Sequence, residues 1–309
     1  MKSEFEWIER FKKIIPRKMQ GLIPIGDDTA LLRGASGSKW LFTTDVMVDG
    51  VDFIRGQIPP EMAGRKAVAV NLSDIAAMGG KPVAFVAALG IPEGISEGWL
   101  EKFYRGMTAT AQKYRTLFVG GDISRSKEFF CSVAMLGQAP ASGALTRSGA
   151  RPGDWIGVTG ALGGSILKHH YAFEPRILEG SFLAEHVRPS AMMDISDGLV
   201  QDLGHILKAS NAGAEIDIRS IPPSRDAVKL GKGRCWETLW HSLGDGEDFE
   251  LLFTMKDSDK RKLEKIWPKK FPKTRLSWMG KIRKKKGIQW LDNEKPIQLK
   301  LKKKGFQHF

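Results

Sequence analysis

Carboxylates and hydroxyls follow short apolar segments at several places in this 309-residue chain. In "AMMDISDGL", Asp194, Ser196 and Asp197 come directly after a run that is typical of a buried strand. Unpaired carboxylates are costly to bury, and the usual remedies are a proton, a cationic partner or a metal ion. The same arrangement recurs in "IGDDTALL", "LFTTDVMVDGVDF", "AVNLSDIAAMGG", "FVGGDIS" and "GDGEDFELLFT". This repetition indicates that the acids serve a shared chemical purpose.

The potential metal-ligand atoms in these segments are all oxygens, since none of the segments contains histidine or cysteine. Oxygen-only ligation favours hard cations, so Mg²⁺ is expected rather than zinc or copper. Bound Mg²⁺ would attract a polyphosphate, because it bridges phosphate oxygens and neutralises their charge. We predict that four of the acids converge on one site that binds two or more Mg²⁺ ions with ATP, namely Asp45, Asp74, Asp122 and Asp194.

Structural explanations compete for the individual acids. An aspartate at a strand end is more often a turn or helix-cap residue than a ligand. Asp197 could cap the helix predicted in "GLVQDLGHILKAS", and Asp49 and Asp52 could belong to an ordinary turn. Asp74 is the hardest to explain in this way, because it lies three residues after Asn71 on one face of an otherwise apolar helix.

The elements that would position these residues alternate between strand and helix. The hydrophobic spacing predicts strands at 39–48, 82–92, 116–124 and 128–139, and helices at 59–80 and 96–115. The Gly/Ser-rich stretch "SGALTRSGARPGD" then predicts a boundary near residue 143, between domains at 1–143 and 144–309. The glycine-rich "TGALGGS" lacks the lysine of a phosphate-binding loop, so a tight strand-to-helix turn is expected there.

The composition, with 42% hydrophobic and 27% charged residues, is that of a soluble globular protein. No apolar run approaches the roughly 20 residues that a membrane span requires. The N-terminal "MKSEFEWIERFKKII" predicts an amphipathic helix rather than a signal peptide. Cys131 and Cys235 lie far apart in no metal-like spacing, which argues against a disulfide framework and a zinc site. A cytoplasmic location is therefore expected, with no membrane partner.

The positive charge of the chain, formally +13, is concentrated near its end. Residues 256–309 hold 19 Lys or Arg against 5 Asp or Glu, with the runs "KIRKKKG" and "KLKKKG". Such runs could bind nucleic acid, but a solvated basic surface is the favoured interpretation. Trp278, Trp290 and the alternating "IQWL" predict strands beneath the lysines, so the region is expected to be folded.

Taken together, the motifs resemble those of the thiamine-monophosphate kinase family, in the aminoimidazole ribonucleotide synthetase superfamily. They include "GDDTA", "TTDVMVDGVDF", "KAVAVNLSDIAAMGGKP", "VGGDISRS", "LTRSGARPGDWIGVTG", "MDISDGLVQDLGHI", "GEDFELLFT" and "KGFQHF". The resemblance implies transfer of the γ-phosphoryl group of ATP to thiamine monophosphate, with Mg²⁺ as cofactor. It also implies an α/β (α+β) fold in two domains: an N-terminal mixed sheet with helices that pairs in a homodimer, and a C-terminal α/β domain.

The resemblance also implies roles for individual residues. The positions that match magnesium ligands of the family are Asp28, Thr43, Thr44, Asp45, Asp74, Asp122, Asp194 and Asp197. Those that match ATP-binding positions are Tyr104, Gly121, Asp122, Arg147 and Ser196. Those that match the thiamine monophosphate pocket are Asp52, Glu247 and Phe306. The implied catalytic group is therefore Asp45, Asp74, Asp122 and Asp194.

Two departures from the family pattern affect the expected pocket. Asp52 stands where the family usually has histidine, and Gly164 stands where it usually has aspartate. Asp52 could weaken contact with the substrate phosphate, face the cationic thiazolium, or be a turn residue that points to solvent. The alternative functions are another ATP-dependent enzyme of the superfamily and, in a different class, a nucleic-acid-binding protein that uses the basic segment.

Overall fold

The computed structural model describes residues 4–299 and residue 305. Its first half contains a five-stranded sheet in the order β1-β2-β5-β3-β4, in which only β3 and β4 are parallel. The elements of this half are α1 (Glu4–Ile14), β1 (Ala30–Arg33), β2 (Lys39–Val48), α2 (Pro60–Ala77), β3 (Lys81–Ile91), α3 (Glu97–Lys113), β4 (Leu117–Arg125) and β5 (Phe130–Gln138). The mixed N-terminal sheet with helices is therefore confirmed.

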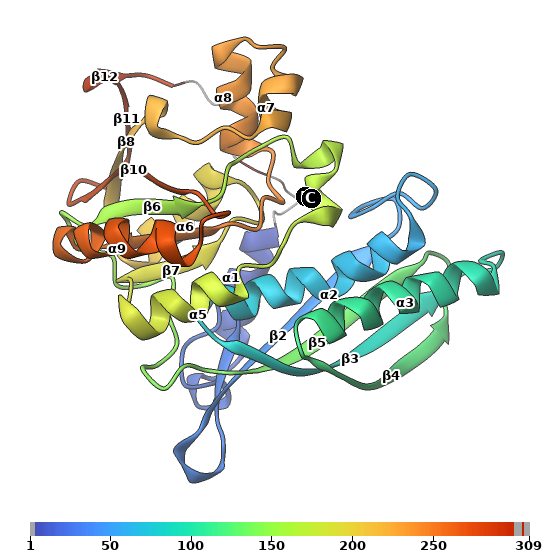
Figure 1. Cartoon of the computed structure of the whole chain (residues 1–309). Coiled ribbons are helices and arrows are strands. Elements are labelled where there is room, and N and C mark those ends of the chain that lie inside the picture. Colours follow the sequence, from blue (N-terminus) through green and yellow to red (C-terminus); the bar gives the residue numbers. More distant parts are fainter. Residues whose placement is uncertain (1–3, 300–304, 306–309) are drawn as a thin grey trace.

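Helices α2 and α3 lie side by side over one face of this sheet (Figure 1). Pro60 begins α2, where its missing N–H costs no hydrogen bond, and Gly79 follows the end of the helix with a φ of 72°. Glycines allow α2 and α3 to approach closely, because a Cβ on Gly64 would lie 1.9 Å from the Phe103 carbonyl oxygen. Gly106 of α3 meets the Glu61 carbonyl oxygen in the same way. Most of α2 is consequently buried, which makes it a rigid support for the polar residues it carries.

The second half contains a seven-stranded sheet in the order β12-β11-β8-β10-β6-β9-β7, in which only β8 and β11 are parallel. Its strands are β6 (Trp155–Thr159), β7 (Ala191–Asp194), β8 (Gly213–Asp217), β9 (Leu251–Met255), β10 (Leu276–Arg283), β11 (Gly287–Asp292) and β12 (Lys295–Ile297). Its helices are α4 (His169–Ala172), α5 (Ile177–His186), α6 (Leu199–Ala209), α7 (Arg225–Leu230), α8 (Cys235–Gly244) and α9 (Asp257–Lys270). The combination confirms the α+β class.

The two sheets share part of their hydrophobic core. One buried cluster joins residues of the first sheet, such as Phe85, to Leu183 of α5, Phe253 of β9 and Trp267 of α9. A second cluster packs α6 against β8 and β10. The boundary expected near residue 143 lies in the segment between β5 and β6, and the division into two domains remains a prediction.

The basic segment is folded over its described part, as expected. Trp290 of β11 is buried and Trp278 of β10 is half-buried, while Lys284, Lys285 and Lys286 lie exposed between the two strands. The strands predicted beneath the lysines are thus confirmed. Lysines 302–304 lie outside the described residues. No helix in the described part of the chain is long and apolar enough to cross a membrane.

Candidate active site

A cleft of about 730 Å³ lies where the two halves of the chain meet, and it is lined by several acids as well as by apolar side chains. One wall comes from the 23–30 segment, β2 and α2, and the other from Arg147, the turn between β7 and α6, and residues 245–249. Of the sequence-predicted site residues, those that line it are Asp28, Thr43, Thr44, Asp45, Asp52, Asp74, Arg147, Ser196, Asp197 and Glu247. The fold therefore gathers residues that are up to about two thirds of the chain apart in sequence.

Three carboxylates meet at the edge of this cleft. One oxygen from each of Asp28, Asp74 and Asp194 lies within 4.8 Å of the other two. Asp74 accepts a hydrogen bond from the Thr43 hydroxyl, and Asp194 accepts one of 2.5 Å from the Ser73 hydroxyl. This group could hold a divalent cation, because its donors are all oxygen and come from three separate elements.

Burial makes the charged form of these acids costly. It raises the pKa of Asp194 to about 7, with the neighbouring Asp28 adding to the shift. It raises the pKa of Asp74 well above its ordinary value, and the charges of Asp45 and Asp194 act in the same direction. Burial likewise raises the pKa of Asp45 to about 6. A divalent cation would remove the penalty, because it stabilises the ionised carboxylates that repel one another without it.

Local structure explains how Thr43 and Asp45 reach the group. Alternate residues of β2 point to opposite faces of the sheet, so both side chains lie on the face that α2 covers. Asp74 extends from the last turns of α2, and Asp194 ends the buried strand β7. Asp74 of "NLSD" therefore lies close to "TTD" of β2 and "MMD" of β7, because α2 packs between the two sheets.

Asp122 is not brought into this group within one chain. It pairs with Ala88, which pairs with Ser132, which in turn pairs with Val46. Residues paired across strands share a face, so Asp122 lies on the same face as Val46 and opposite to Asp45. It is exposed on β4, at the edge of the sheet and three strands from β2. Its predicted place in the metal site remains a prediction.

The predicted ATP residues Tyr104 and Gly121 also lie away from the cleft lining. The Tyr104 ring stacks on Phe118, with 5.8 Å between ring centroids. A Cβ on Gly121 would lie 1.9 Å from the Ala87 carbonyl oxygen, so packing between β3 and β4 already requires glycine there. Arg147, in contrast, lines the cleft and donates to Asp28 Oδ1 from Nη2 at 2.5 Å and from Nε at 3.1 Å.

Lys66 is a cleft residue that sequence reasoning missed. Its side chain is almost completely buried, and Nζ donates to the Asp52 carbonyl oxygen at 2.7 Å and to Glu247 Oε1 at 2.5 Å. The same ammonium lies 3.4 Å from Nδ1 of His170. The available signal was a lysine within the apolar stretch of α2, because a lysine is rarely buried without partners.

The carboxylate of Asp52 belongs to its own turn. Its Oδ2 accepts a hydrogen bond of 2.7 Å from the backbone N–H of Val48, while the residue also lines the cleft. Glu247 stands in the left-handed region with a φ of 54° and points its carboxylate at Lys66. Phe306, the third residue of the predicted substrate pocket, lies outside the described residues.

Two acids of "GDGEDFELLFT" besides Glu247 accept hydrogen bonds from the backbone of the glycine-rich turn "TGALGGS". Asp248 accepts from the backbone N–H of Gly163 at 2.7 Å, and Asp245 accepts from that of Gly164 at 2.8 Å. Gly164 has a φ of 75°, and a Cβ there would lie 2.4 Å from the Ala227 nitrogen. The expected tight turn from strand to helix is confirmed, with β6 leading into a short 3-10 helix at Ser165–Leu167.

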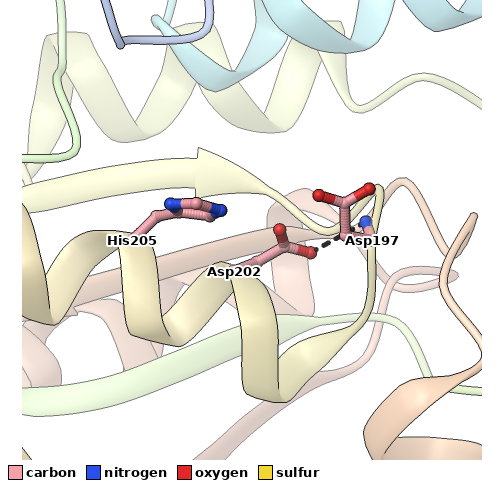
Figure 2. Close-up of side chains that lie close together, drawn as sticks. All are labelled: Asp197, Asp202 and His205. Atoms are coloured by element: carbon pink, nitrogen blue, oxygen red, sulfur yellow. Dashed lines mark hydrogen bonds between the residues drawn. The ribbon is translucent and has the colours of Figure 1, made fainter. Parts of the chain in front are cut away.

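A second group of potential ligands, Asp197, Asp202 and His205, stands at the start of α6 (Figure 2). Asp202 and His205 were missed, although "DLGH" places them three residues apart on a predicted helix. Gly198, rather than Asp197, is the N-cap residue of α6. Asp197 Oδ2 accepts a hydrogen bond of 2.8 Å from Gln201 Nε2.

Comparisons with known proteins agree with this geometry. Residues 26–139 match the family model "AIR synthase related protein, N-terminal domain". The thiamine-monophosphate kinase of Buchnera aphidicola subsp. Schizaphis graminum is 35% identical, with 99% of each chain covered. That of Escherichia coli K12 is 36% identical, with 85% of each chain covered.

Solved structures extend the likeness to three dimensions. The structure of AaThiL complexed with AMPPCP and TMP has a TM-score of 0.79 and 31% identity, over 99% of this chain and 97% of that chain. The thiamine monophosphate kinase of Aquifex aeolicus has a TM-score of 0.75 and 29% identity, and the match covers 95% of this chain and 98% of that chain. Escherichia coli HypE, a hydrogenase maturation protein, shares the fold at 18% identity and a TM-score of 0.71, over 85% of each chain.

Proposed function

This chain belongs to the thiamine-monophosphate kinase family, and we propose that its cleft transfers the γ-phosphoryl group of ATP to thiamine monophosphate. The products are thiamine diphosphate and ADP. The observation that carries the proposal is the meeting of Asp28, Asp74 and Asp194 at the edge of a cleft of about 730 Å³ that also contains Arg147. Phosphoryl transfer depends mainly on positioning and charge neutralisation, so such a cleft suits the reaction without a nucleophilic side chain.

The donor set fits Mg²⁺. Asp28 Oδ2 and Asp45 Oδ2 are buried and accept no hydrogen bond from the described residues, which leaves lone pairs for an ion. We propose that Asp28, Thr43, Asp45, Asp74 and Asp194 hold Mg²⁺, with Asp197 at the margin of the group. The Thr44 hydroxyl lies on the opposite face of β2, 3.4 Å from that of Ser132, so Thr44 would reach the ion only through its backbone. When bound, Mg²⁺ neutralises the charge that develops on the phosphate oxygens.

Side chains of the cleft would orient the two substrates. We assign Arg147 to the phosphates of ATP, because its guanidinium lines the cleft and Asp28 fixes its direction. Ser196, in the turn after β7, lines the same cleft and would supply a further donor. We assign Glu247 to the cationic thiamine ring system, because Lys66 holds its carboxylate toward the same cleft. Asp52 would help to shape this pocket, because its carboxylate holds the turn that follows β2 at the edge of the cleft.

We further propose a homodimer formed through the first sheet. Its uncovered face carries exposed apolar side chains, including Phe42 (44% exposed), Val46 (54%) and Val86 (41%). Asp122 lies on this face beside them, so pairing of two chains would bring it and Gly121 to the partner subunit. In that arrangement, Tyr104, Gly121 and Asp122 would contact the ATP that is bound in the cleft of the partner subunit. We also propose a cytoplasmic location, which suits the free thiols of Cys131 and Cys235.

The test is an assay of thiamine diphosphate formation from ATP and thiamine monophosphate, with an aminoimidazole ribonucleotide precursor as the competing substrate. Wild type should phosphorylate only thiamine monophosphate. Asp74→Asn should lower kcat at least about a hundredfold, because it removes a charge that ion binding needs, whereas Asp259→Asn on α9 should retain full rate. Turnover of the precursor alone would assign the chain to another reaction of the superfamily.

A further inference from the structure

Phe249 lines the cleft two residues after Glu247, but its side chain can bind neither a metal ion nor a phosphate. Lys66 and Val70 of α2 line the cleft as well, and Val70 packs against the small apolar cluster that contains Phe249. Aromatic side chains beside a few polar groups are typical of sites for small organic ligands. The ring therefore supplies apolar surface in the part of the cleft where Glu247 and Lys66 form their ion pair.

The backbone at Phe249 has an unusual conformation. Its φ is 49°, in the left-handed region that a bulky side chain rarely adopts. Of the non-glycine residues with a positive φ in the described part of the chain, Glu247 and Phe249 are the two that line the cleft. The backbone N–H of Glu247 donates to the Ser196 carbonyl oxygen at 2.6 Å, and that of Phe249 donates to the Ile195 carbonyl oxygen at 2.8 Å. These bonds hold a strained segment, and such strain gathers at functional sites.

Phe173, the residue that follows α4, packs against the ring of Phe249. The two rings stack with 4.0 Å between their centroids and 19° between their planes. Phe173 is 1% exposed and is not one of the residues that line the cleft. Close packing restricts a side chain to few orientations, so Phe173 fixes the direction in which Phe249 meets the cleft.

Arg65 of α2 holds Phe173 in place. Its guanidinium donates to the carbonyl oxygen of Tyr171 at 2.9 Å and to that of Phe173 itself. The guanidinium carbon lies 5.7 Å from the centroid of the Phe173 ring, which suits a cation–π interaction. Arg65 also forms an ion pair of 3.3 Å with Glu174. Contacts therefore run from α2 through Arg65 and Phe173 to Phe249.

We propose that Phe249 is a specificity residue that packs against a heteroaromatic ring of the phosphoryl acceptor, and that Phe173 and Arg65 are positioning residues for it. This role rests on the proposed transfer to thiamine monophosphate, and it names the side chain that recognises the flat part of that substrate. Glu247 would meet the positive charge of the thiazolium, while the Phe249 ring favours a flat cation over a hydrated one. Binding of ATP would not require the ring, because phosphates are bound by other residues of the cleft.

The competing explanation is that the two stacked rings only stabilise the fold, since both are largely buried. Loss of a purely structural ring would lower stability and would change the kinetics with both substrates alike. Loss of a specificity residue would change KM for the acceptor alone. The two explanations therefore differ in the separate KM values.

The experiment measures kcat and KM for thiamine monophosphate and for ATP, on the full-length chain with Mg²⁺. In Phe249→Leu, KM for thiamine monophosphate should rise about tenfold, while kcat and KM for ATP stay within about twofold of wild type. Phe249→Tyr keeps the ring and should retain the wild-type KM. Phe173→Leu and Arg65→Lys should each raise the same KM by a smaller factor.

Phe182→Leu is the matched control. Phe182 of α5 stacks on the His186 ring, with 4.4 Å between centroids, and it does not line the cleft. Both KM values should be unchanged in this variant. An unchanged KM for thiamine monophosphate in Phe249→Leu would overturn the proposal, and so would an equal rise of KM for ATP or an equal effect of Phe182→Leu. Unchanged values in Phe173→Leu and Arg65→Lys would overturn the positioning roles.

Nuclear Overhauser effects give a second readout that does not depend on a destabilising substitution. The protein is deuterated except at its phenylalanine rings, and thiamine monophosphate is added. Wild type should show effects between these rings and the ring protons of the substrate, and Phe249→Tyr, whose tyrosine ring is deuterated, should lose at least one of them. Retention of all the effects in Phe249→Tyr would overturn the contact.

The outcomes also separate this role from the proposed function. Formation of thiamine diphosphate by wild type, together with an unchanged KM in Phe249→Leu, would overturn the role of Phe249 alone. Absence of thiamine diphosphate from the wild-type reaction would overturn the proposed function and this role together.

Discussion

At the scale of the residue, Lys66 shows how a buried charge can organise a site. Its ammonium has three neighbours that can accept a hydrogen bond, in Asp52, Glu247 and His170. These neighbours come from the loop after β2, the segment before β9 and α4. A buried charge that loses its partners is strongly destabilising, so the three contacts explain why this helix tolerates a lysine.

Substitution of Lys66 should therefore change substrate binding more than the chemical step. In Lys66→Met, Glu247 loses the contact that orients it, so KM for thiamine monophosphate should rise at least about tenfold while kcat falls less. Lys81→Met is the matched control, since Lys81 is exposed and its ion pair among the described residues is with Glu185 at the surface. Steady-state kinetics with varied thiamine monophosphate measures the difference. An unchanged KM with a lower kcat would instead place Lys66 in phosphoryl transfer.

Asp52 differs from Lys66 in that its carboxylate closes a backbone turn. Asp52→Ala should lower the free energy of unfolding by about 1 kcal/mol, because the Val48 N–H loses its acceptor. Asp52→Asn keeps an acceptor oxygen and should retain both stability and KM for thiamine monophosphate within about twofold. Urea unfolding and steady-state kinetics measure the two quantities. A large change of KM in Asp52→Asn would show that the negative charge itself contacts the substrate.

At the scale of the element, α2 determines where the oxygen donors stand. It is buried between the first sheet, α3 and α5, and its last turn carries Asp74 toward β2 and β7. Its approach to α3 depends on glycine, because a Cβ on Gly106 would lie 1.9 Å from the Glu61 carbonyl oxygen. Backbone cannot yield as a flexible side chain can, so the helix must move if this space is filled.

Gly106→Ala should accordingly destabilise the protein and reduce its activity together. The overpacking should cost about 1–3 kcal/mol, and displacement of α2 should weaken Mg²⁺ binding at Asp74. Gly98→Ala is the matched control in the same helix, because nothing lies within 4 Å of the added methyl group. That control should be neutral or stabilising by up to about 1 kcal/mol. Urea unfolding measures both, and equal stability of the two variants would contradict the close-packing argument.

At the scale of the whole molecule, the buried carboxylates of the cleft repel one another when they are ionised, and a bound cation would remove this repulsion. The raised pKa values of Asp45, Asp74 and Asp194 mean that the folded protein binds more protons than the unfolded chain above about pH 4. Their contribution to stability is therefore lost as pH rises through the folded pKa values, about 6 for Asp45 and about 7 for Asp194. The lowered pKa values of His170 and His205 act in the opposite direction, but only below their ordinary value of 6.5.

Metal-free protein should thus lose stability between about pH 6.5 and about pH 8, by on the order of 1 kcal/mol through Asp45 and Asp194, with Asp74 adding to the loss. Excess Mg²⁺ should abolish most of this loss, because the ion binds the ionised carboxylates of the folded state only. Urea unfolding at several pH values, with a chelator or with Mg²⁺, tests both statements. Stability that rises over this range without metal would show that these acids are ionised in the folded protein.

Much of this protein was predictable from local sequence. The spacing of apolar residues predicted α2, α3 and the strands of the first sheet, because helix and strand periods are properties of neighbouring residues. The absence of histidine and cysteine from the acid-bearing segments indicated an oxygen site for a hard cation. The glycines of "TGALGGS" indicated a tight turn, which a φ of 75° at Gly164 now explains.

Tertiary structure alone decided which acids share a site. Asp28, Asp74 and Asp194 lie together because α2 packs between two sheets, whereas Asp245 and Asp248 hold a turn. Strand register placed Asp122 on the face opposite to Asp45, although the two motifs look alike in sequence. A carboxylate has the same chemistry in every motif, but its partner is set by distances that only the packed chain defines. Sequence by itself therefore determined the kind of chemistry, and the packing of α2 and the register of the strands decided where that chemistry takes place.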